Sequence, residues 1–216
     1  MNHPNKLVFL SLAFYLSSCD APATKQTNDA DLVDTVALTE DIGTTVDSVP
    51  TVAELTHKHY ESVMEMVEDR NDFSTEDGTL KLISKSPLHI QISHQEDKNQ
   101  DVNRMKRVAM QYLVSNAYAA FACTDVSTVT ITSVPSDMDE FINNQKLVLL
   151  NAAAVTVTIT RDKARQVMQS RVGTSNFDDM LGITVGKSYF ADSPSPLLNK
   201  LKAEDTVEDV ISELKS

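Results

Sequence analysis

Apolar residues recur along the chain in three patterns, and each pattern predicts a different kind of element. Residues 7–16 form a nearly continuous apolar run, LVFLSLAFYL. Between Thr51 and Arg70, apolar side chains recur at helical spacing, which predicts a helix that begins at Thr51 and has Glu54 as its capping partner. His59 falls on the apolar stripe of this helix, so we expect its imidazole to lie in or near the core.

Strict alternation follows between residues 80 and 92, and it predicts β-structure. The apolar positions are all even-numbered: Leu80, Leu82, Leu88, Ile90 and Ile92. A polar break at 84–87 predicts a hairpin with a three-residue loop that pairs Leu82 with Leu88, although one long bent strand would keep the same faces. Pro87 favours a position at a sheet edge in either case.

The strongest helix is predicted from Asp101 to Cys123, where one face is apolar and the opposite face is rich in arginine and glutamine. Cys123 lies on the apolar face at the C-terminal end, where the helix dipole disfavours a thiolate, so we interpret it as a buried structural cysteine. Asn116 lies on the same face. A buried asparagine there either fixes the position of the helix against the sheet, the interpretation we prefer, or faces a ligand pocket.

The C-terminal half adds two strands and several helices. The strands, 127–134 and 152–160, alternate valine or isoleucine with threonine and share the sequence VTIT. A helix is expected over 161–171 with Gly173 at its end, and the last helix is expected to begin after a cap at Asp205.

This order of elements predicts the fold class. We expect an α+β domain over residues 51–216, built as a two-layer sandwich of a mainly antiparallel sheet with helices on one face. The threonine-rich face of the sheet would then meet solvent. The length is sufficient for one domain to bury a core without disulfides.

The N-terminal apolar run ends in a motif of its own. Lys6 precedes the run, and Leu16-Ser17-Ser18-Cys19 closes it. The arrangement resembles the lipobox of bacterial lipoprotein signal peptides. The resemblance implies that Leu16, Ser17 and Ser18 are recognised by the signal peptidase, that residues 1–18 are removed, and that Cys19 carries the lipid. The alternatives are an ordinary cleaved signal peptide, with Cys19 incidental, and a buried helix.

The residues after Cys19 refine this picture. Asp20 resembles the retention signal of enterobacterial lipoproteins, which favours the periplasmic face of the inner membrane over the outer membrane. Residues 19–50 contain seven acidic residues against one lysine, a composition typical of an extended flexible tether. Apolar residues between 32 and 42 leave open a short amphipathic segment that binds a partner. Ten apolar residues are too few to span a bilayer, so we expect no transmembrane helix in the mature chain.

Charge and motifs restrict the chemistry. The net charge of −12 disfavours nucleic acid and anionic lipid surfaces as partners. No phosphate-binding loop, dinucleotide fingerprint, serine-hydrolase elbow or zinc-protease motif occurs, so we predict no catalytic residue, metal or cofactor. His57 with Glu54 and Glu61 could approach a metal ion, but a solvated polar face is the preferred interpretation. Phe190, beside a lysine and a tyrosine, is expected to anchor its loop in the core.

The function expected from these features is that of a lipid-anchored accessory module. It would bind a protein partner in the cell envelope without catalysing a reaction. Two alternatives stay open: an envelope hydrolase with a site that one sequence does not reveal, and a small-ligand carrier with an apolar cavity between helices and sheet.

Overall fold

The computed structural model describes residues 57–70, 73–185 and 188–215. The chain divides into two units, 1–46 and 47–216, and all described residues belong to the second. The predicted signal peptide and tether lie outside the described residues, as do Leu16, Ser17, Ser18, Cys19 and Asp20. Within the described ranges, no helix combines the length and the apolar character that crossing a membrane requires.

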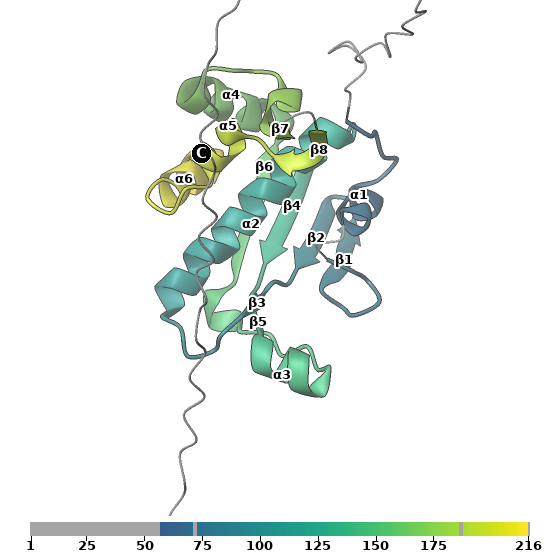
Figure 1. The fold of residues 1–216 in the computed structure, drawn as a ribbon, viewed down its shortest axis with the longest axis vertical. Coiled ribbons are helices and arrows are strands. Elements are labelled where there is room, and N and C mark those ends of the chain that lie inside the picture. Colours follow the sequence, from purple (N-terminus) through teal and green to yellow (C-terminus); the bar gives the residue numbers. More distant parts are fainter. Residues whose placement is uncertain (1–56, 71–72, 186–187, 216) are drawn as a thin grey trace, which may run out of the picture. The chain divides into compact units, whose positions relative to one another are not determined.

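A four-stranded sheet forms the centre of the domain (Figure 1). Its strands, in spatial order, are β1 (Leu80–Lys85), β2 (Leu88–Ile92), β4 (Thr128–Ser133) and β6 (Val155–Thr160). The pairs β1–β2 and β4–β6 are antiparallel, whereas β2–β4 is parallel. The predicted α+β class and mainly antiparallel sheet are therefore confirmed, with one parallel pair that makes the sheet mixed.

The parallel pair follows from the helix between its strands. Parallel neighbours cannot be joined by a tight turn and need a crossover connection. The 22-residue helix α2 (Val102–Cys123) provides it, running back across the sheet between β2 and β4. Asp101 caps this helix by accepting hydrogen bonds from the backbone N–H groups of Asn103 and Arg104, so the predicted helix is confirmed at both ends.

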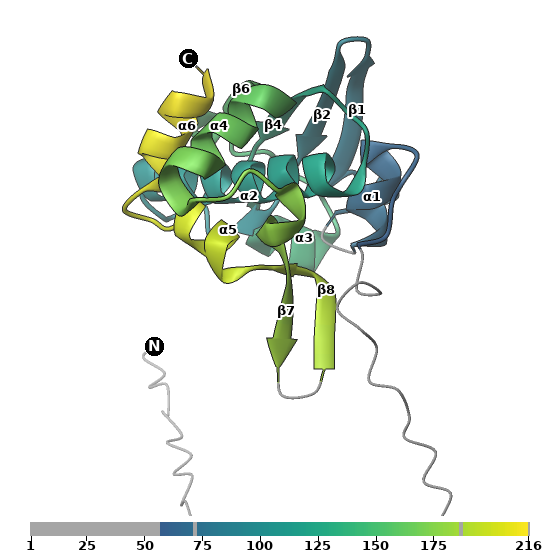
Figure 2. The same ribbon diagram turned by 90° about the horizontal axis from the view of Figure 1, so that it is seen from above.

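The two faces of the sheet differ as predicted. On one face Ile90, Ile131 and Ile159 are fully buried under the helices. On the other face threonines pair across the strands: the Oγ1 atoms of Thr130 and Thr158 are 2.8 Å apart, as are those of Thr132 and Thr156. Figure 2 shows α1 (Val63–Asp69) and α2 on the same side of the sheet. Helices α4 (Arg161–Val172) and α6 (Val207–Lys215) complete the core.

The β1–β2 hairpin is confirmed, but its predicted loop is wrong. Leu82 pairs with Ile90 instead of Leu88, and the strands are joined by only two residues, Ser86 and Pro87. An irregularity at Ile83 shifts the register by one residue, which keeps Leu82 and Leu88 on the same side despite the shorter loop.

The first helix begins much later than the sequence pattern predicts. Ser62 is its N-cap, with Oγ accepting from the N–H of Glu65 at 3.1 Å, and residues 57–62 are not helical. The backbone N–H of Tyr60 instead donates to the carbonyl of Cys123 at 2.8 Å, and the buried aromatic ring is that of Tyr60. The prediction for His59 is therefore wrong: its side chain is 59% exposed and lies near Asp125.

The remaining elements surround this core. The short strands β3 and β5 pair in parallel, and β7 and β8 form a separate antiparallel hairpin. Their bounds, with those of the other short elements, are β3 (Gln95–Glu96), β5 (Ser136–Asp137), α3 (Met138–Asn144), η2 (Asn151–Ala153), η3 (Phe177–Met180), β7 (Leu181–Val185), β8 (Ser188–Pro194) and α5 (Pro196–Leu201).

Three further predictions can be compared with these elements. Gly173, with φ of 82°, ends α4 as predicted, because the left-handed conformation suits glycine. Helix α6 begins at Val207, so the predicted cap at Asp205 is wrong by at least one position. Phe190 is 50% exposed on the β7–β8 hairpin, which contradicts its predicted role as a core anchor.

Candidate binding site

A polar pocket of about 670 Å³ lies over the outer side of α2. The spacing of Val108, Gln111, Tyr112, Ser115 and Asn116 places them along one side of the helix. The other walls come from elements distant in sequence: the end of α1, the end of β8, and α5. Their lining residues are Arg70, Ser193, Pro194, Asn199 and Lys202.

Arg70 is the distinctive residue of the pocket. It follows the last turn of α1, where its backbone N–H donates to the carbonyl of Met66 at 3.3 Å. Two of its guanidinium nitrogens, Nε and Nη1, are enclosed by protein and have no hydrogen-bond partner. Enclosed donors without partners are rare in proteins, because each one costs about 1–3 kcal/mol of stability. The cost is higher when the donor is charged. An anionic group beside the guanidinium would offset part of the cost of enclosing its charge.

Asn116 belongs to the pocket, which favours the second of its two predicted roles. The residue is 4% exposed, and its Nδ2 donates to the carbonyl of Tyr112 one turn earlier at 2.9 Å. Such a bond to the same helix does not connect α2 to the sheet. The side chains of Gln111 and Ser115 make no hydrogen bond with the residues that the structure describes, so their polar groups are available to a ligand.

The charge of the pocket is opposite to that of the chain. Among its described lining residues are two cationic side chains, Arg70 and Lys202, and no carboxylate. The chain as a whole has 31 acidic residues against 19 basic ones. The pocket is therefore a locally cationic region within an acidic protein, and it favours anionic groups.

Tyr112 forms an aromatic wall of the pocket. Its ring stacks on the imidazole of His94, with ring centroids 4.5 Å apart and planes inclined by 21°. The ring of Phe73 makes an edge-type contact with it, with centroids 5.7 Å apart. His94 is 4% exposed, and neither of its ring nitrogens has a partner. Burial lowers the pKa of His94 to about 4, so the imidazole behind Tyr112 is neutral near neutral pH.

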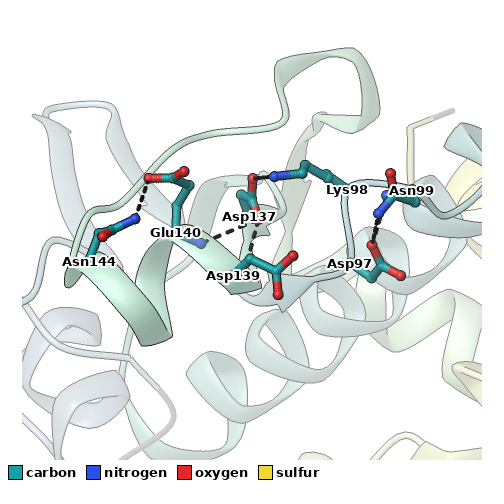
Figure 3. Close-up of polar contacts among 7 residues, drawn as sticks. All are labelled: Asp97, Lys98, Asn99, Asp137, Asp139, Glu140 and Asn144. Atoms are coloured by element: carbon teal, nitrogen blue, oxygen red, sulfur yellow. Dashed lines mark hydrogen bonds and ion pairs between the residues drawn. The ribbon is translucent and has the colours of Figure 1, made fainter. Parts of the chain in front are cut away.

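A second polar cluster, near the start of α3, is internally satisfied (Figure 3). Lys98 donates to Asp137 at 3.0 Å, and the side chain of Asp137 is 5% exposed. The other oxygen of Asp137 caps α3, accepting from the N–H of Asp139 at 3.0 Å. The bond from Lys98 lowers the pKa of Asp137 and raises that of Lys98. Because Lys98 and Asp137 already satisfy each other, this cluster is better explained by stability than by ligand binding.

A groove of about 900 Å³ separates the N-terminal end of α1 from the β1–β2 hairpin. Its lining is largely apolar, with Val63, Met64, Leu82, Leu88 and Val126 among its residues. The groove is an open surface rather than the enclosed cavity expected of a carrier, and nothing in the structure indicates what covers it.

Apart from Asn116, the residues singled out in the sequence do not line this pocket. His57 contacts the backbone carbonyl of Asp178, with Nε2 at 3.0 Å, and Glu54 lies outside the described residues. Over the described ranges, no group of three histidine, cysteine, aspartate or glutamate side chains could hold a metal ion. Cys123 is 1% exposed, as predicted for a structural cysteine. Arg70, which the sequence places in an ordinary helix, carries no local signal of its role.

Comparison with known proteins adds no assignment. No family model matches the chain, and no curated protein or solved structure matches it significantly. Inference about function therefore depends on the residues and their geometry.

Proposed function

We propose that the protein is a lipid-anchored, non-catalytic binding module of the bacterial cell envelope that recognises a protein partner. The observation that carries the binding role is the pocket over α2, where Arg70 has enclosed nitrogens without a partner. The anchor and the envelope location are supported by the motif Leu16-Ser17-Ser18-Cys19 and by the acidic stretch that follows it.

Binding is favoured over catalysis by the composition of the pocket. Acyl transfer and hydrolysis require a nucleophile beside a general base, or a bound metal. Ser115 is the nearest candidate for a nucleophile on α2, but the described lining contains no histidine, cysteine, aspartate or glutamate that could act as its base. The same lining offers hydrogen-bond donors and a cation, which are the groups that hold a ligand.

The anchor is tested by replacing its cysteine. We expect Cys19→Ala to abolish labelling with a fatty-acid analogue and to release the protein from membranes, because the lipid is the only proposed source of membrane affinity. Cys123→Ala is the matched control and should keep the label, since that thiol is buried in the folded domain. Labelling that persists in Cys19→Ala contradicts the anchor. Separation of the two membranes by density should place the wild type in the inner membrane.

The partner is tested by capture. Full-length tagged protein, extracted from envelopes with a mild detergent, is expected to retain a companion protein in a fixed ratio. Recovery of the protein alone contradicts the accessory role. Recovery with a bound small molecule and no protein supports the carrier alternative, because the volume of the pocket lies within the range of small-ligand sites.

A further inference from the structure

We infer that the pocket over α2 recognises a carboxylate group, held by Arg70, with an apolar group of the ligand beside it. The inference rests on the proposed binding function and names the chemistry of what is bound. Within that function, the carboxylate belongs to an acidic side chain or to the C-terminus of the partner protein.

Arg70 supplies the pocket with a cation that has enclosed nitrogens without partners. The guanidinium group has five N–H donors and no acceptor, and it keeps its charge at all physiological pH values. Enclosing Nε and Nη1 of Arg70 without partners is unfavourable in the free protein. A carboxylate matches the planar donor arrangement and can accept two parallel hydrogen bonds, which are among the strongest in proteins. A carboxylate beside the guanidinium would therefore offset the cost that enclosing this charge imposes on the free protein.

Polar residues from other elements line the pocket together with Arg70. Gln111 and Ser115 line the pocket from α2, Asn199 lines it from α5, and Lys202 lines it from the residue after α5. With Arg70, they surround the cavity from three elements. No described lining residue is acidic, so none of these residues competes with the ligand for the guanidinium.

The position of the two cationic residues relative to the helix ends favours a carboxylate over a phosphate. Phosphate sites commonly use the N-terminal ends of helices, where free N–H groups and the helix dipole favour multiple negative charge. Arg70 and Lys202 instead follow the C-terminal ends of α1 and α5, where the dipole is negative. A single negative charge on a planar group is better suited to this environment than a phosphate dianion.

The pocket also has an apolar wall, formed by Tyr112 and Val108. Tyr112 lines the pocket and is 39% exposed as a residue, and its ring packs against His94 and Phe73. Val108 lies one turn earlier on the same side of α2. An exposed aromatic wall held by packing offers contact area at little entropic cost. The ligand is therefore expected to bear an apolar or aromatic group close to its carboxylate.

The test uses benzoate, acetate and phosphate as probes on the full chain in detergent, at constant ionic strength set with chloride. The side-chain Nε–H resonance of Arg70 reports the arrival of a negative charge beside the guanidinium. We expect a saturable shift with benzoate, a weaker one with acetate and the weakest with phosphate. An absent shift overturns the inference, as does a stronger response to phosphate than to either carboxylate.

Variants separate recognition from general charge. Arg70→Gln should weaken benzoate binding by about tenfold or more, and Arg70→Lys should weaken it less but measurably, because lysine keeps the charge without the planar pair of donors. Arg104→Gln is the matched control, since Arg104 is exposed at the start of α2 and bonds only to Gln100 among described residues. Equal affinities in Arg70→Gln and Arg104→Gln overturn the inference.

The capture experiment distinguishes failure of this inference from failure of the proposed function. If the wild type and Arg70→Gln retain the same companion protein equally, the inference is wrong and the binding function stands. If benzoate binds saturably but no companion protein is ever recovered, the carboxylate site stands and the protein-partner role is wrong.

Discussion

Two arginines of this domain lie in contrasting surroundings. Arg161, at the start of α4, donates to the backbone carbonyls of Val126 at 3.0 Å and Phe121 at 2.8 Å, and also to that of Thr124. Its guanidinium carbon lies 5.4 Å from the ring centroid of Phe121 and 5.3 Å from that of Phe177. Arg70 has none of this: two of its nitrogens are enclosed without a partner.

The difference indicates two uses of the same side chain. Arg161 closes the end of α2, where the last helical carbonyls have no partner within the helix, so its donors stabilise the fold. The donors of Arg70 contribute nothing comparable and instead raise the energy of the unliganded domain. A protein retains such an arrangement at a functional site, where stability is lost in exchange for binding.

Replacement of Arg161 should have the largest effect. Arg161→Gln leaves carbonyls at the end of α2 without donors, and we expect the free energy of unfolding to fall by about 4 kcal/mol in urea titrations. Arg165→Gln is the control on the same helix, because Arg165 is exposed, pairs with the exposed Asp162, and lies 5.5 Å from the ring centroid of Phe177 without donating to any helix-end carbonyl among the described residues. Its effect should stay within about 1 kcal/mol. Similar losses in both variants would contradict the structural role of Arg161.

Acid should destabilise the region of the pocket through His94. The folded pKa of about 4 lies below the value of about 6.5 expected in the unfolded chain, so between these values only the unfolded state binds the proton. Stability is therefore full above pH 7 and falls by roughly 3 kcal/mol as the pH is lowered to 4. His94→Phe keeps a ring against Tyr112 and should flatten this part of the pH profile. An unchanged slope in the variant would show that other groups control it.

Replacement of Arg70 should have the smallest effect, and in the opposite direction. Arg70→Met retains much of the side-chain volume and removes the enclosed unpaired charge. We expect the free energy of unfolding to rise by about 1 kcal/mol or to stay unchanged, while ligand binding is lost. A loss of stability similar to that of Arg161→Gln would mean that Arg70 supports the fold, and the contrast between the two arginines would disappear.

Much of the scaffold was predictable from the sequence, because its signals are local. The 22 residues of α2 carry a sustained apolar face and a cap at Asp101, and the alternation of threonine with valine or isoleucine defines β4 and β6. The parallel neighbours β2 and β4 were not predicted, since which strands meet depends on how α2 packs. His59 and Phe190 were wrongly assigned to the core because an apolar pattern does not determine which residues the rest of the chain covers.

The candidate site was beyond prediction for the same physical reason. Its walls bring Arg70 to the side of α2 that α5 also borders, and Asn199 lies well over one hundred positions later in the chain. Neither residue belongs to a motif. What marks the site is a missing hydrogen-bond partner, and a missing partner is a property of the folded molecule alone. Asn116 was the nearest signal, as a polar residue on an apolar helix face.

The irregular strand β1 has a consequence for behaviour at high concentration. Unprotected edge strands can pair with strands of neighbouring molecules and start aggregation. Here the edge strand β1 is short, and its regular pairing is disturbed at Ile83. Lys81 and Lys85 add positive charge along it. An incoming strand would encounter an interrupted template and exposed lysine charge, so crowded copies of the domain should resist pairing through this edge.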